Sequence, residues 1–144
     1  MFKHLLVPTD GTALSSKAVR AAIDFAKTVN AAVTLITVSE PFHIIAVDDP
    51  VLLLQTEEEY LKASAQLAKK ILKGGEDYAQ SKGVRVDSLH VYEVAPYRAI
   101  VGASKGCDLI FMASHGRKGI AALLLGSETQ KVLTHAKIPV LVYR

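Results

Sequence analysis

Five short aliphatic segments alternate with longer segments of helical periodicity, and this alternation constrains the fold of the chain more than any other feature. The five segments are predicted strands and span residues 5–7, 32–38, 84–91, 109–113 and 138–143. Strands that alternate with helices are typical of a parallel sheet with helices on both faces. We therefore expect an α/β fold with a doubly wound, flavodoxin-like or Rossmann-like sheet of five strands. The 144 residues contain no evident linker or repeat, so we expect one domain over residues 1–144.

Helical signals fill the segments between the predicted strands. Apolar residues recur every three or four positions at Ala18, Ala22, Phe25 and Val29, and again at Tyr60, Ala63, Leu67, Ile71, Gly74 and Tyr78. Pro96 favours the first turn of a helix and Gly106 favours a helix end, so we expect a third helix between them. Ser127 and Gln130 have the spacing of a capping box, which predicts the start of a last helix that Pro139 stops.

The third predicted strand differs from the others because polar residues alternate along it. These residues are Arg85, Asp87, Ser88 and His90, whereas the first, second and fourth strands are continuously apolar. Strands buried on both faces are continuously apolar, so the third strand belongs at an edge. The order 3-2-1-4-5 satisfies this, whereas 2-1-3-4-5 would expose the apolar second strand. In the favoured order the winding reverses between strands 1 and 4, where open α/β sheets bind ligands.

A segment with the composition of an anion site follows the fourth strand. It runs from Gly116 to Gly126 and Ser127, is rich in small residues, and ends where the last helix begins. Glycines let backbone N–H groups approach phosphate oxygens, and a helix N-terminus attracts anions. No Walker A motif is present. A purely structural interpretation stays open, in which Ser127 caps the helix and the glycines only turn the chain.

Two further candidate side chains come directly after the first and fourth predicted strands, and we expect both to lie at the same crevice. Asp10 is expected to contact a ribose hydroxyl or a metal-bound phosphate, or else to bond backbone N–H groups of its own turn. His115 is a candidate for phosphate contact or for packing within its loop. The remaining histidines lack the spacing of metal ligands, so we expect no protein metal site.

Composition narrows the classes of partner. The net charge of +3 is scattered along the chain, which argues against nucleic-acid binding. No apolar run is long enough to span a bilayer, so we expect no membrane insertion and a cytoplasmic protein. Cys107 is the single cysteine, which excludes an internal disulfide, and we interpret it as a small buried or half-buried hydrophobe.

Several motifs together resemble the universal stress protein family over essentially the whole chain. They are KHLLVPTDGTALSSKA, the strand end Thr37-Val38, CDLIFMASHGRKG, LLLGSETQKVL and IPVLVYR. The resemblance implies a flavodoxin-like fold of strand order 3-2-1-4-5, frequent dimerisation, and synthesis under stress or growth arrest. One branch of the family binds ATP through G-x2-G-x9-G-[ST], and another branch lacks this motif and binds none.

Carried over by position, the resemblance implies a nucleotide site of twelve residues. These residues are Pro8, Thr9, Asp10, Val38, Met112, Ala113, His115, Gly116, Gly126, Ser127, Glu128 and Thr129. Val38 would contact the adenine, Met112 and Ala113 the ribose, and the residues from His115 onward the phosphates. Ala113 stands where the motif has its first glycine, and its single methyl is expected to weaken the site rather than remove it.

The function we expect is a regulatory or stress-protective module that binds ATP, with Mg²⁺ carried on the phosphates. It would act as a homodimer through the apolar last strand, Ile138 to Tyr143, with no protein partner that the sequence identifies. Two alternatives stay open: a dimeric interaction protein without a ligand, and a slow ATPase for which Asp10, His115 and Arg117 are the nearby polar candidates. A phospho-acceptor receiver domain is disfavoured because it needs an aspartate where the chain has Glu93.

Overall fold

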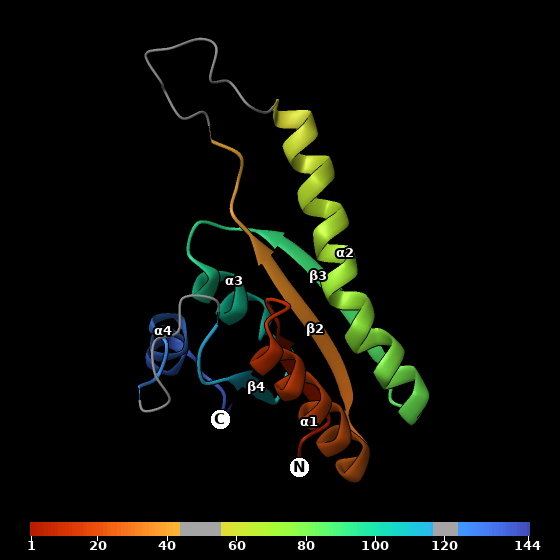
Figure 1. The fold of residues 1–144 in the computed structure, drawn as a ribbon. Coiled ribbons are helices and arrows are strands. Elements are labelled where there is room, and N and C mark those ends of the chain that lie inside the picture. Colours follow the sequence, from red (N-terminus) through yellow and green to blue (C-terminus); the bar gives the residue numbers. More distant parts are fainter. Residues whose placement is uncertain (44–55, 117–123) are drawn as a thin grey trace.

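Five parallel strands form one sheet in the computed structural model, which describes residues 1–43, 56–116 and 124–144. The strands are β1 (His4–Pro8), β2 (Ala32–Ser39), β3 (Val86–Tyr92), β4 (Leu109–Ala113) and β5 (Val140–Tyr143). Their order is β3-β2-β1-β4-β5, and every neighbouring pair is parallel. Figure 1 shows β2 and β3 running side by side beneath α2. The predicted fold class and strand order are therefore confirmed.

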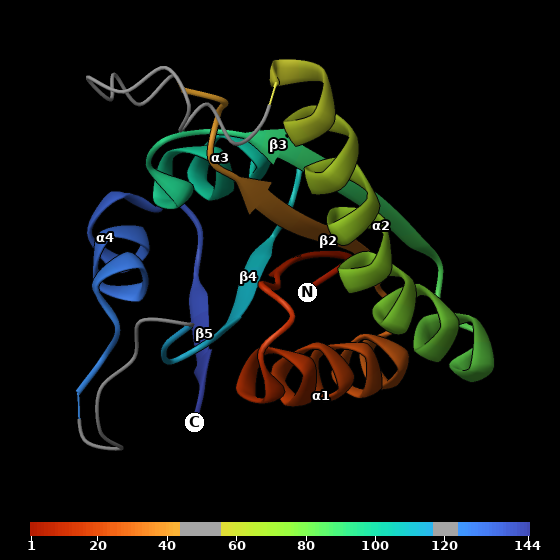
Figure 2. The same ribbon diagram turned by 45° about the horizontal axis from the view of Figure 1, so that its top comes forward.

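Helices cover both faces of this sheet. They are α1 (Ala13–Val29), α2 (Glu57–Lys82), α3 (Pro96–Ala103) and α4 (Ser127–His135). Alternate residues of β1 enter opposite cores: Leu5 and Val7 pack with α1 and α2, and Leu6 packs with α3 and α4. The turned view shows these two helical layers, one on each side of the strands (Figure 2). This arrangement leaves the carboxyl ends of the strands between the two layers.

Several predicted boundaries shift by a few residues. The third strand begins at Val86 rather than at residue 84, and the last strand begins at Val140, directly after Pro139. The prediction that Gly106 ends α3 is wrong, because the helix ends at Ala103. Gly106 instead has a φ of 86° in the turn that leads into β4, a conformation that glycine adopts without strain.

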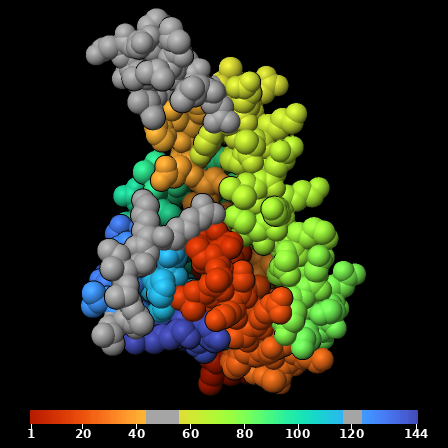
Figure 3. Space-filling model, in the orientation of Figure 1, coloured from red at the N-terminus to blue at the C-terminus, as the bar shows by residue number. Residues whose placement is uncertain are grey.

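Helix α2 forms where a helix is predicted, but the residues it buries are not the apolar residues whose spacing predicted the helix. The buried residues are Ala68, Leu72, Gly75 and Ala79, a row that lies beside the predicted stripe rather than along it. A Cβ on Gly75 would lie 2.6 Å from Cδ1 of Leu35, so glycine allows close contact with β2. The space-filling view shows the second half of α2 packed along α1 (Figure 3). The first three turns, residues 57–67, contain no buried residue and extend beyond the sheet (Figure 1).

At the amino ends of the strands, hydrogen bonds connect the segment before β4 to the start of β1. The Asp108 carboxylate accepts hydrogen bonds from the backbone N–H groups of Lys3 and His4, which lower its pKa. Cys107 beside it is half-buried against the core of α3 and α4, and burial raises the pKa of its thiol. The interpretation of Cys107 as a half-buried hydrophobe is confirmed.

Candidate ligand-binding cavity

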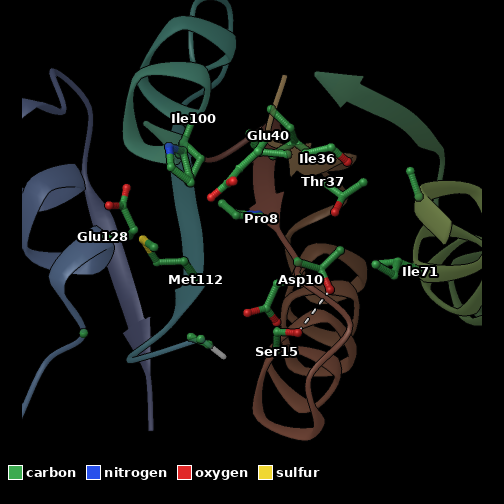
Figure 4. A pocket seen from close by; sticks show the side chains of 18 of the residues that line it. Pro8, Asp10, Ser15, Ile36, Thr37, Glu40, Ile71, Ile100, Met112 and Glu128 are labelled. Atoms are coloured by element: carbon green, nitrogen blue, oxygen red, sulfur yellow. Dashed lines mark hydrogen bonds between the residues drawn. The ribbon is translucent and has the colours of Figure 1, made fainter. Parts of the chain in front are cut away.

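A cavity of about 860 Å³ opens at the carboxyl ends of β1, β2 and β4. It lies where the winding of the sheet reverses, the place that the strand order predicts for a ligand. Its lining includes all twelve residues that the sequence assigns to a nucleotide site. Figure 4 shows Pro8 near the middle, with Met112 and Glu128 on one side and Asp10 and Ile71 on the other. The structure therefore gathers the candidate residues, although their contacts with a nucleotide remain a prediction.

In the turn after β1, the two carboxylate oxygens of Asp10 have different neighbours. Its Oδ1 accepts hydrogen bonds from the backbone N–H of Thr12 at 3.0 Å and from the Thr12 hydroxyl at 2.7 Å. Its Oδ2 lies so close to Gly116 that a Cβ there would collide with it. The local-turn interpretation is therefore correct for one oxygen, and the carboxylate also borders the cavity. Gly116 makes room for Asp10, a role that the glycine spacing alone did not reveal.

Thr9 and Ser15 form a buried hydroxyl pair beside this turn. Their oxygens lie 3.2 Å apart, and the backbone N–H of Thr9 donates to the Ile36 carbonyl at 2.9 Å. Thr9 belongs to the predicted site, whereas Ser15 was missed because it lies inside α1, two residues beyond its start. The pair gives the α1 side of the cavity neutral polar atoms.

The start of α4 differs from the predicted capping box. Gly126 is the N-cap residue, because its carbonyl accepts from the N–H of Gln130 at 3.0 Å, and Ser127 is already helical. No side chain caps this helix, and the Gln130 amide instead donates to the Leu125 carbonyl at 2.8 Å. The capping-box prediction is wrong because the N–H of Gly126 is tied to the Ser114 carbonyl at 2.8 Å, which fixes the cap one residue earlier. The first N–H groups of α4 have no acceptor within the helix.

Close packing, rather than an unusual backbone angle, explains the glycine at 126. Its φ is −59°, which any residue adopts, but a Cβ would lie 3.0 Å from Cα and 3.1 Å from Cβ of His115. The His115 ring in turn has Nδ1 3.2 Å from the Ser114 hydroxyl oxygen. The two ends of the loop are therefore in direct contact where the cavity meets α4.

Glu128 and Thr129 use their side chains for structure. The Glu128 carboxylate accepts from the backbone N–H of Tyr97 at 2.9 Å and from Lys131 Nζ at 3.1 Å. The Thr129 hydroxyl donates to the Ala113 carbonyl at 3.1 Å. These contacts tie α4 to α3 and β4. If either residue contacts an anion, its backbone N–H is the available group.

The remaining predicted residues form the apolar floor. Met112 and Ala113 are buried at the end of β4, and Val38 packs partly against the same core as Met112. Pro8 ends β1 between them. Flat apolar contact at this floor suits an aromatic ring or a sugar face.

Sequence reasoning missed one whole wall of the cavity, contributed by residues 60–71 of α2. Its lining residues are Tyr60, Ala63, Ser64, Leu67, Ala68 and Ile71. The helical spacing of this stripe was visible in the sequence, but spacing does not say whether a helix faces a core or a cavity. The side chain of Tyr60 ties this wall to β2, because its hydroxyl donates to the Glu40 carbonyl at 2.5 Å.

Carboxylates outnumber cations in the described lining. Asp10, Glu40 and Glu128 carry negative charge, while Lys131 is the one lysine or arginine among the described lining residues and is paired with Glu128. Arg117, a candidate from the sequence, lies outside the described residues. Over the described ranges, no three metal-ligating side chains gather as a metal site would require. Likewise, none of the helices described is long and apolar enough to cross a membrane.

Fold and cavity together define an α/β protein with a ligand-sized cavity at the switch point of its sheet. The family model described as "Universal stress protein family" matches residues 1–144, and the chain belongs to this family. Universal stress protein MJ0531 of Methanocaldococcus jannaschii is 34% identical over 149 residues, which cover 100% of this chain and 83% of the relative. The resemblance read from the motifs is therefore confirmed.

Solved structures of the family are similar to this chain. The universal stress protein UspA from Lactobacillus plantarum has a TM-score of 0.83 and 26% identity, covering 99% of this chain and 98% of that one. A universal stress protein solved in complex with cAMP has a TM-score of 0.71 and 25% identity, covering 99% of this chain and 97% of that one.

Proposed function

We propose that the protein is a cytoplasmic regulatory or stress-protective module that binds an adenine nucleotide, ATP with Mg²⁺, in this cavity. The observation that carries the proposal is the uncapped N-terminus of α4, where Ser127 and its neighbours line the cavity. Such N–H groups bind phosphate oxygens, and the helix dipole favours the negative charge. The similar protein that was solved with cAMP supports an adenine nucleotide as the ligand class.

The dimensions of the cavity fit a nucleotide. Its volume of about 860 Å³ lies within the range of small-molecule sites, roughly 300–1,000 Å³. β2 and β4 are separated by one strand, so Val38 and the start of α4 flank a span of about 10 Å, long enough to separate a base from its phosphates. The carboxylates of Asp10 and Glu128 disfavour a bare triphosphate. A Mg²⁺ ion on the phosphates would offset this charge, since it prefers oxygen ligands.

Binding rather than turnover is the activity that these residues favour. Hydrolysis needs a group that positions water and charges that stabilise the transition state. The Asp10 Oδ1 atom is engaged by Thr12, and the His115 Nδ1 atom lies beside Ser114. We therefore expect phosphate release far below about 1 per second, the low end for dedicated enzymes. A phosphate-release assay that gives faster turnover would establish the ATPase alternative instead.

The proposed assembly is a homodimer that pairs β5 with its copy. β5 is a sheet edge made of Val140, Leu141, Val142 and Tyr143, and such an apolar edge invites pairing with another chain. Val140 packs against the core of α3 and α4, whereas Val142 belongs to neither described core. Val142→Lys is therefore the cleaner probe of the edge. The sequence also allows a monomer in which the long, apolar segment of residues 40–54 covers this edge, and most of that segment lies outside the described residues.

The assembly is tested by sedimentation of Val142→Lys beside Leu133→Lys, a charge added at an exposed position of α4. The proposal expects wild type and Leu133→Lys to be dimers and Val142→Lys to be a monomer. A monomeric wild type at micromolar concentration would rule the β5 contact out.

Ligand binding is tested by denaturing the purified protein and analysing the released small molecules for adenine nucleotide. Isothermal titration with ATP and Mg²⁺, and separately with GTP, then measures affinity and base preference. We expect copurified adenine nucleotide or direct ATP binding. If neither is found, the dimeric interaction protein without a ligand becomes the better account.

A further inference from the structure

Among the serine and threonine residues that are buried in the described part of the chain, one differs from all the others in its hydroxyl. The seven buried serine and threonine side chains are Thr9, Ser15, Thr34, Thr37, Ser104, Ser114 and Thr129. Six of them have a hydrogen-bond partner in the protein. Thr37 is 3% exposed, and no protein group makes a hydrogen bond with its hydroxyl. This exception lines the cavity.

The position of Thr37 places its hydroxyl on the α2 side of the cavity. It is the sixth residue of β2 and directly precedes Val38. Side chains alternate along a strand, so Thr37 and Val38 point to opposite faces of the sheet. Figure 4 shows Thr37 on the side toward Ile71 of α2, with Asp10 and Ser15 nearby and Met112 across the cavity.

Packing alone does not account for a threonine at this position. Among the described residues, the fully enclosed side-chain oxygen or nitrogen without a partner is Ser88 Oγ and not Thr37 Oγ1, so the Thr37 hydroxyl reaches the open space of the cavity it lines. Valine has nearly the same shape and would fill the position as well, but it offers no polar atom to a molecule in the cavity. Both residues are β-branched and suit a strand equally. Thr34 on the same strand shows the structural use of such a hydroxyl, because its oxygen lies 2.8 Å from Nε2 of His4.

We propose that the Thr37 hydroxyl hydrogen-bonds the base of the bound nucleotide and makes Thr37 a specificity-determining residue. This inference rests on the proposed function. Thr37 lies on β2, with β1 between it and β4, so it is distant from the α4 N-terminus that would hold the phosphates. A hydroxyl both donates and accepts, which matches the mixed donor and acceptor edge of adenine. The hydroxyl pair of Thr9 and Ser15 and the aliphatic Ile71 give this side the mixed lining that a base requires.

The test compares Thr37→Val with Thr34→Val, a matched removal of a hydroxyl that has a protein partner outside the cavity lining. Thermal unfolding of the ligand-free proteins measures stability, and titration with ATP and Mg²⁺ measures affinity. Thr37→Val is expected to keep or raise Tm and to weaken ATP binding by up to about tenfold, the worth of one hydrogen bond. Thr34→Val is expected to lower Tm and leave the ATP affinity unchanged. Thr37→Ser, which keeps the hydroxyl, is expected to bind more tightly than Thr37→Val.

The outcomes separate this inference from the function on which it rests. If the wild type binds no adenine nucleotide, the proposed function fails and the ligand named here fails with it. If the wild type binds ATP and Thr37→Val binds equally well, only the role of Thr37 is overturned. A clear fall in the Tm of Thr37→Val would likewise overturn it, since the hydroxyl would then serve the fold.

Discussion

The α4 wall and the α2 wall of the cavity are built in different ways. At the α4 wall, the lining residues belong to the uncapped start of the helix, and close contacts between Gly126 and His115 hold this start in place. At the α2 wall, side chains face the cavity, and residues 57–67 of the helix contain no buried residue. Side-chain hydroxyls connect this wall to the sheet: the Tyr60 hydroxyl donates to the carbonyl of Glu40 after β2, and Ser64 Oγ lies 2.8 Å from the Tyr92 hydroxyl oxygen.

From this difference we infer a division of labour, in which the α4 wall contacts the charged part of a ligand and the α2 wall contacts its uncharged part. A rigid wall of N–H donors suits phosphate, because the donors need no reorganisation when the anion arrives. A wall of aliphatic and hydroxyl side chains suits the uncharged part of a ligand. Changes at the α4 wall should therefore affect binding more strongly than changes at the α2 wall.

The largest effect is expected from Gly126→Val. Its branched side chain would press on the His115 backbone and displace the start of α4, with a loss of affinity on the order of 100-fold. Isothermal titration with ATP measures the loss. Gly74→Val is the matched control, because a Cβ at Gly74 meets no atom within 4 Å and lies on the outer side of α2. Unchanged affinity in Gly126→Val would remove the α4 wall from the site.

Gly116→Ala should have the next largest effect. The new methyl would displace the Asp10 carboxylate, which borders the cavity, and weaken ATP binding by about tenfold. Gly102→Ala, in α3, adds the same methyl in open space and serves as the control. If both variants bind like wild type, the position of Asp10 is irrelevant to the ligand.

Leu67→Ala tests the α2 wall directly. Leu67 is 50% exposed and lines the cavity, so a bound base would cover part of it and truncation should cost about threefold in affinity. Leu61 is 39% exposed on the same helix but is not among the described lining residues, and Leu61→Ala should bind normally. A loss for Leu67→Ala as large as for Gly126→Val would contradict the division of labour.

Ala113→Gly should have the smallest effect. Removing the methyl at the end of β4 restores the glycine of the family motif, so ATP binding should tighten by about twofold. The added freedom of the unfolded chain should lower stability by up to about 1 kcal/mol. Titration and thermal unfolding measure the two changes. Weaker binding would show that the Ala113 methyl is itself a contact.

The sequence predicts the α4 wall far better than the α2 wall, for physical reasons. Alternating polarity at residues such as Asp87 places β3 at the edge, and from this follow the strand order and the crevice. Phosphate sites depend on glycine spacing and helix starts, which are local in sequence, so Gly116 and Gly126 were found. The α2 wall depends on which way a distant helix faces, and Leu67 has the same periodicity as a core residue. Whether the Thr37 hydroxyl has a hydrogen-bond partner likewise depends on the tertiary structure, so no local sequence pattern predicts it.

The central claim is that an adenine nucleotide binds with its phosphates at the α4 wall and its base toward β2. Titration of the ¹⁵N-labelled protein with ATP and Mg²⁺, followed by NMR, tests it residue by residue. The account predicts the largest shifts at the amides of Ser127, Glu128 and Thr129, a second group at Thr37 and Val38, and none at Lys82, at the far end of α2. Shifts confined to another surface, or no shifts at millimolar ATP, would contradict it.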